Sequence, residues 1–117
     1  MTKRLSSNAK RLLHDKCLDD LVSKLAPKPG FLCPNAEYYI EKDGDSYRGE
    51  CDIRKITRNS QGVKFERYYE VKWRDSAYLR KKAVNQFKRH AKCHEGFKYI
   101  YVTPERVINY TSKILNG

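Results

Sequence analysis

With 117 residues, the chain can build one domain around a single hydrophobic core but is too short for two. Its 25 Lys and Arg outnumber 14 Asp and Glu, and the formal net charge of +11 predicts a polyanionic partner, nucleic acid first and an anionic membrane surface second. No apolar run approaches the roughly 20 residues of a membrane span, and the start lacks a secretory signal, so we expect a cytoplasmic, single-domain protein.

The first element is predicted to be a helix over residues 6–25. Leucines recur there at helical spacing, and Ser6 or Ser7 can cap the start of the helix. Pro27 follows soon after the last leucine and is typical of a helix end.

An antiparallel meander of three strands is expected next. The predicted strands span residues 36–41, 47–56 and 63–74. Asp43-Gly44-Asp45 supplies the first turn, and Gly62 stands in the second loop where a positive φ would be needed.

Residues 76–93 predict a second helix, which is strongly basic and contains no Asp or Glu. Ion pairs four residues apart ordinarily support an exposed helix, so an acid-free face is better suited to binding a polyanion. A solvated surface is the alternative. The residues expected to contact phosphates are Arg80, Lys81, Lys82, Lys88, Arg89 and Lys92.

An apolar strand over residues 97–103 and a last helix over 105–115 complete the prediction. Pro104 would stand at the start of this helix, where proline is tolerated. The expected order is α-β-β-β-α-β-α, which is an α/β fold with a mixed central sheet flanked by helices.

The four cysteines form no C-x-x-C pair, and together with the three histidines they match no familiar zinc spacing. Cys17 in the first helix and Cys51 on the apolar face of its strand are expected to be small buried hydrophobes. A disulfide stays open, because intracellular bridges occur in hyperthermophiles.

The most informative motif is the triplet Glu70-Val71-Lys72 near the end of the third strand. Residues i and i+2 of a strand point to the same face, so Glu70 and Lys72 would share one face. The opposite, apolar face would carry Tyr69, Val71 and Trp73.

The preceding strand carries Glu50 and Asp52 on one expected face, with Cys51 and Ile53 on the other. If the two strands pair with their apolar faces on the core, three acids and one lysine converge on one patch. Carboxylates of this kind suit a hard cation such as Mg²⁺, which can polarise a phosphate and activate water. The alternative is a charged, solvated strand face.

The order of elements, with G-E-C-D-I at 49–53 and Y-E-V-K-W at 69–73, resembles the core of the PD-(D/E)xK nuclease superfamily over residues 9–103. The resemblance implies a restriction-endonuclease-like core. It also implies that Asp52, Glu70 and Lys72 are catalytic and that the two acids hold Mg²⁺, for which Mn²⁺ can substitute. Cys51 stands where the family has a proline before the acid.

Archaeal Holliday-junction resolvases and their viral relatives are similar in size and carry an acid in the first helix. The resemblance puts Asp15 in that place as a catalytic and metal-binding residue, with an exposed helix position as the alternative. Gln86 would match a glutamine of many relatives and is otherwise a surface residue. Glu50 would take an outer-shell or second-metal role, or would pair with an arginine.

The resemblance therefore implies a Mg²⁺-dependent DNA endonuclease. Selectivity for junctions or branched DNA is one form that this activity takes among the similar proteins. A non-catalytic basic nucleic-acid-binding protein and an RNA-directed nuclease stay open. A resolvase cuts two strands symmetrically, which implies a homodimer. Additional phosphate contacts are expected from Lys3, Arg4, Lys10 and Arg11.

Overall fold

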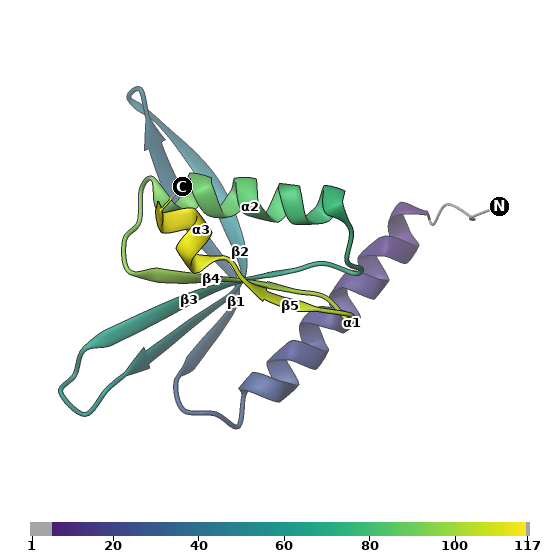
Figure 1. Cartoon of the computed structure of the whole chain (residues 1–117), viewed down its shortest axis with the longest axis horizontal. Helices are drawn as coiled ribbons and strands as arrows, with labels where there is room; N and C mark the ends of the chain where they lie inside the picture. Colours follow the sequence, from purple (N-terminus) through teal and green to yellow (C-terminus); the bar gives the residue numbers. More distant parts are fainter. Residues whose placement is uncertain (1–5, 117) are drawn as a thin grey trace.

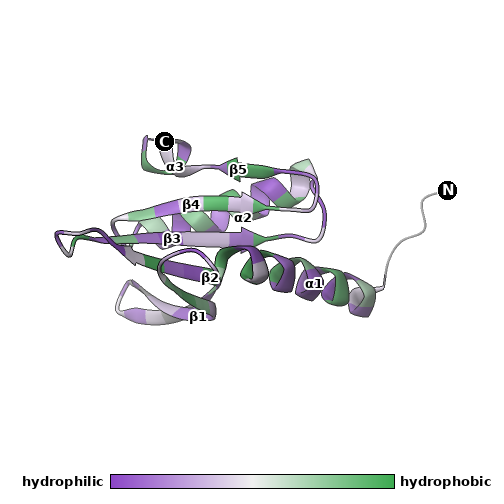
Figure 2. Ribbon diagram, turned by 90° about the horizontal axis from the view of Figure 1, so that it is seen from below, coloured by the Kyte–Doolittle hydropathy of each residue, from purple (hydrophilic) through white to green (hydrophobic). Residues whose placement is uncertain are grey.

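A mixed five-stranded sheet forms the centre of the structure, a computed structural model that describes residues 6–116. The strands are β1 (Phe31–Lys42), β2 (Asp45–Arg58), β3 (Lys64–Val71), β4 (Phe97–Val102) and β5 (Val107–Asn109). They lie side by side in chain order, as Figure 2 shows. The β3–β4 pair is parallel and the other three pairs are antiparallel. Because a parallel pair needs a crossover, a helix connects β3 to β4.

Three helices cover the two faces of this sheet (Figure 1). They are α1 (Ser7–Leu25), α2 (Ala77–Ala91) and α3 (Thr111–Asn116). Leucines of α1 form one core with the apolar residues of one sheet face, and α2 and α3 form a second core on the other face. The alternation of β3 serves both cores, because Tyr68 packs under α2 whereas Tyr69 and Val71 pack under α1.

The two long helices begin where the sequence predicts. The Ser6 hydroxyl accepts a hydrogen bond from the Ala9 N–H at 3.1 Å, and the Ser76 hydroxyl accepts one from the Leu79 N–H at 3.1 Å. Both serines therefore satisfy a backbone donor of the first helical turn. The three-strand meander is also confirmed, and Gly62 adopts a φ of +81°.

The third strand is shorter than predicted, because β3 ends at Val71 instead of Arg74. The Lys72 N–H still donates to the Val102 carbonyl at 2.9 Å, and the chain then leaves the sheet. It must turn within a few residues to start α2 over the sheet face, and Ser76 already caps that helix. Trp73 therefore lies beyond the strand.

The predicted helix over 105–115 is wrong in its first half and confirmed only from Thr111 onward. Residues 103–106 form a turn in which the Thr103 hydroxyl and backbone bond to Arg106. The β-branched pair Val107 and Ile108 then joins the edge of β4 as β5, and α3 begins only at Thr111. The observed order is α-β-β-β-α-β-β-α.

All four cysteines are free; Cys51 is buried and Cys17 is half-buried. The prediction of small apolar cysteines thus holds fully for Cys51 only. Within residues 6–116, no helix combines the length and the hydrophobicity that a membrane crossing requires.

Removal of two methyl groups from Val71 should destabilise the fold. Val71 is 0% exposed and packs beneath α1, so Val71→Ala is expected to lower the free energy of unfolding by about 2 to 3 kcal/mol. Val63→Ala is the matched control, because Val63 is 49% exposed and should cost well under about 1 kcal/mol. Urea unfolding of both variants measures the difference, and equal losses would contradict this core assignment.

Candidate functional site

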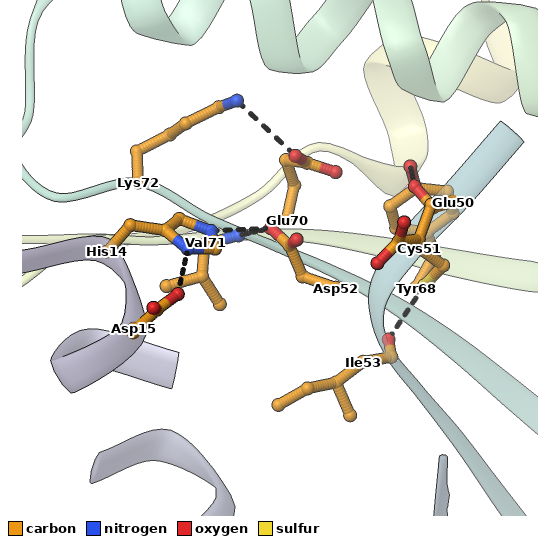
Figure 3. Close-up of polar contacts among 10 residues, drawn as sticks. All are labelled: His14, Asp15, Glu50, Cys51, Asp52, Ile53, Tyr68, Glu70, Val71 and Lys72. Carbon is orange, nitrogen blue, oxygen red and sulfur yellow. Dashed lines mark hydrogen bonds and ion pairs between the residues drawn. The ribbon is translucent and has the colours of Figure 1, made fainter. Parts of the chain in front are cut away.

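Asp52 lies where β2 and β3 stop pairing. The ladder between these strands runs from Arg58 and Lys64 to Ile53 and Tyr69. One residue further, Oδ2 of Asp52 accepts the Val71 N–H at 2.8 Å (Figure 3). A side-chain carboxylate thus replaces a backbone carbonyl as the acceptor, and it holds Asp52 against the end of β3.

The side-chain alternation of β2 breaks at the same residue. Cys51 packs in the core under α2, whereas Ile53 packs in the core under α1, so the predicted common face of these two residues is wrong. On the neighbouring strand β1, Pro34 pairs with Ile53 and Ala36 pairs with Cys51, so Asn35 and Asp52 are skipped in the ladder. Asn35 adopts a left-handed φ of 53°. The distorted backbone on both strands explains why simple two-residue periodicity fails there.

Glu70 is the most buried acid of the site, with a side chain only 5% exposed. Its Oε1 lies 3.3 Å from Nζ of Lys72, while its Oε2 is buried and has no hydrogen-bond partner. Burial raises the pKa of Glu70 strongly, the negative charge of Asp52 raises it further, and Lys72 opposes both effects. The predicted proximity of these three residues is therefore present in the structure.

His14 of α1 approaches the carboxylate of Asp52 (Figure 3). Its Nε2 lies 3.5 Å from Oδ2 of Asp52, and its Nδ1 lies 3.4 Å from Oδ1 of Asp15. The hydrogen bond to Asp52, against the opposing effect of burial, raises the pKa of His14 to about 8. The four side chains His14, Asp52, Glu70 and Lys72 form what we call the acid pair site.

Sequence reasoning missed His14 as a member of this site. A signal was present, because His14 precedes Leu18, Leu21 and Leu25 at spacings of four, three and four residues. The three leucines pack toward the sheet, so a residue at that spacing faces the sheet as well. The position of β2 beneath that face was not readable from the same pattern.

The other predicted site residues lie elsewhere. Asp15 has a 56% exposed side chain that contacts His14, and Glu50 is exposed. Gln86 is half-buried, with a buried Oε1 that has no partner. Among the residues that the structure describes, no three His, Cys, Asp or Glu side chains are arranged to hold a metal ion. The predicted metal-binding residues Asp15, Glu50, Asp52 and Glu70 are thus not found together as one such group.

The chemistry of the acid pair site nevertheless suits a hard divalent cation. Asp52 and Glu70 supply carboxylate oxygens, and the unpartnered Oε2 of Glu70 is a free acceptor in a buried position. Mg²⁺ is usually bound through one or two carboxylates and keeps several water ligands. A third acidic residue is therefore not required for such an ion to fit.

The predicted phosphate-contacting residues of α2 are mostly free for such a role. The exposed members are Lys81, Lys82, Lys88 and Arg89 in α2 and Lys92 directly after it. Arg80 is different, because it pairs with Asp75 at 3.6 Å and that acid also pairs with Arg106. Lys10 and Arg11 lie in the first two turns of α1, and Lys3 and Arg4 lie outside the described residues.

Comparison with known proteins gives information on the fold of this chain only. No protein-family model matches the chain, and no curated protein matches it at a significant level. A solved structure, the crystal structure of SSO0001, is similar with a TM-score of 0.54 and 21% sequence identity over 86% of this chain. The chain spans 50% of the length of that protein. The likeness supports the α/β arrangement of sheet and helices.

The raised pKa values predict that metal-free protein loses stability as the pH rises. Folded His14 binds its proton more tightly than an unfolded histidine, so its contribution is complete below its ordinary pKa of 6.5 and is lost through about 8. That shift corresponds to about 2 kcal/mol. Glu70, whose pKa is also raised, adds a loss of the same sign from 4.5 upward.

Urea unfolding in chelator between about pH 6 and about pH 9 measures this effect. His14→Gln should make the loss between 6.5 and about 8 smaller by the contribution of His14 and keep the contribution of Glu70. A free energy of unfolding that rises over this interval would contradict both assignments.

Proposed function

We propose that this protein is a metal-dependent nuclease of the PD-(D/E)xK type that hydrolyses phosphodiester bonds in DNA. The observation that carries the proposal is the convergence of Asp52, Glu70 and Lys72 at the point where β2 and β3 separate. Two neighbouring carboxylates with an adjacent lysine are suited to holding a cation and a phosphate together.

The arrangement of elements supports a restriction-endonuclease-like core. A helix, a three-strand antiparallel meander that ends in the E-x-K triplet, a second helix and a parallel fourth strand follow one another in the chain. In this topology the chain leaves the sheet at Lys72, whose ammonium group contacts Glu70, and α2 begins a few residues later.

Asp52 and Glu70 would hold Mg²⁺ or Mn²⁺, and His14, whose Nε2 lies 3.5 Å from Oδ2 of Asp52, would keep the Asp52 carboxylate in position. When bound, such an ion would supply positive charge to the phosphate and lower the pKa of its bound water. Lys72 orients the nucleophile or stabilises the negative charge that develops in the transition state. Asp15 contacts Nδ1 of His14 and would hold the imidazole in this orientation.

The exposed cations of α2 would bind the phosphate backbone without reading its sequence. Selectivity for junctions or branched DNA and the homodimer stay predictions. An RNA substrate and a purely binding role are the two alternatives.

A cleavage assay separates these alternatives. Four-way junction, duplex, single-stranded DNA and RNA are incubated side by side with Mg²⁺, with Mn²⁺ and with chelator.

Substitution of either acid should abolish cleavage while leaving DNA binding nearly intact. Asp52→Asn and Glu70→Gln each remove a cation ligand but keep the size of the side chain, so a loss of more than about 100-fold in rate is expected. Asp19→Asn on the exposed face of α1 and Glu41→Gln in β1 are matched controls and should cleave normally. Wild-type rates from Asp52→Asn in Mg²⁺ would overturn the catalytic assignment.

Binding to DNA should weaken steeply with salt. Lys81→Ala and Lys88→Ala each remove one exposed cation of α2, so each should lower the slope of log affinity against log salt concentration by about one. Lys24→Ala in the last turn of α1 is the control and should leave the slope unchanged. Fluorescence anisotropy of a labelled duplex measures these slopes, and equal slopes for all variants would exclude α2 as the contact surface.

A further inference from the structure

Two aromatic side chains lie in the segment that leads from the acid pair site into α2. Trp73 directly follows Lys72, and Tyr78 lies in the first turn of α2 with 68% of its surface exposed. A cation lies over each ring: the guanidinium carbon of Arg74 is 4.5 Å from the ring centroid of Trp73, and Nζ of Lys82 is 5.2 Å from that of Tyr78.

The fold itself gives little reason for an exposed ring at Tyr78. The side chain belongs to neither hydrophobic core, and the buried stripe of α2 consists of Ala83, Val84, Phe87 and His90. Residues 72–82 also carry five basic side chains and one acid, Asp75, which is paired with Arg80 and Arg106. The segment thus presents the exposed ring of Tyr78 and the half-buried ring of Trp73 among an excess of cations, a combination typical of surfaces that bind nucleic acid.

The arrangement favours unpaired over paired nucleotides. The exposed Tyr78 ring has a cation over one face only, and a base that stacks on an aromatic ring gains about 1–3 kcal/mol whatever its identity. The neighbouring cations can contact the adjacent phosphates. In an intact duplex the faces of the bases are already covered by one another, so only splayed or single-stranded bases can stack on Trp73 and Tyr78.

We propose that Trp73 and Tyr78, each with its overlying cation, form a stacking platform that holds single-stranded nucleotides next to the acid pair site. The inference rests on the proposed nuclease function and specifies its substrate class: nucleic acid that is unpaired beside the cleaved bond. Free strands, flaps and opened junctions all present such nucleotides.

The tryptophan gives a direct test, because Trp73 is the single tryptophan of the chain. Wild-type protein in chelator, which prevents cleavage, is titrated with oligo(dT) and with a duplex of equal length while Trp73 fluorescence and binding anisotropy are recorded. We expect quenching by oligo(dT) and much weaker quenching by the duplex. Tyr78→Ala should lower oligo(dT) affinity by about 5- to 150-fold and duplex affinity by less than about twofold.

Two variants control for the ring and for the position. Tyr78→Phe keeps the ring and should retain the affinity for oligo(dT). Tyr39→Ala removes an equally exposed tyrosine from β1, where the exposed fraction is 62%, and should change neither affinity. Tyr78 lies outside both cores, so thermal unfolding of Tyr78→Ala should match the wild type and confirms that the variant is folded.

Three results would overturn the platform: no loss of oligo(dT) affinity in Tyr78→Ala, an equal loss on both DNAs, or a loss confined to binding of vesicles that contain anionic lipid. The last result would identify a membrane-binding surface. Because binding is measured in chelator, it does not depend on catalysis. Failure of the nuclease proposal would show separately, as absence of cleavage by wild-type protein in Mg²⁺ or Mn²⁺.

Discussion

The hydrogen bond from the Val71 N–H to the Asp52 carboxylate is the contact on which the rest of the site depends. It closes the β2–β3 ladder with a charged side chain instead of a carbonyl, and it satisfies a donor of the fully buried Val71. Loss of such an acceptor leaves a buried N–H unpaired, which costs about 1–3 kcal/mol. The same bond holds Asp52 next to Glu70. The stability of the strand end and the proposed chemistry of the site therefore both depend on Oδ2 of Asp52.

Charge balance around the two acids explains the arrangement of their neighbours. Glu70 is buried and close to Asp52, so its ionisation is disfavoured without a compensating cation. Lys72 partly neutralises Glu70, and His14 partly neutralises Asp52 from the opposite side. A divalent ion would relieve the remaining repulsion, which links metal binding to the stability of this part of the fold.

The two faces of the sheet contribute differently to the proposed function. The α1 face supplies His14 and its partner Asp15, whereas the segment that starts α2 supplies the exposed ring of Tyr78, the half-buried ring of Trp73 and several cations. Asp75 fastens this segment to the sheet, because it bonds to Tyr101 and pairs with Arg80 and Arg106. The surface that would receive the substrate is therefore anchored to the same strands that carry the acids.

Local pattern alone determined the first helix with its serine cap, the second helix apart from its last two predicted residues, the three-strand meander and the closeness of Glu70 to Lys72. These features depend on neighbours a few residues apart, and the chemistry of each side chain decides them directly. The strand β5 was not predictable in the same way, because three residues with a proline nearby form a strand only when the edge of β4 is available.

The contact between His14 and Asp52 spans 38 residues and depends on how α1 crosses the sheet. Periodicity indicates that His14 faces the sheet, but it does not indicate which strand lies beneath it. Likewise, two-residue alternation assigns Asp52 to a strand face, whereas the separation of β2 from β3 turns it toward Val71. Tertiary structure decided both placements. Long-range packing sets where the strands diverge, and the neighbouring sequence of each residue does not indicate that position.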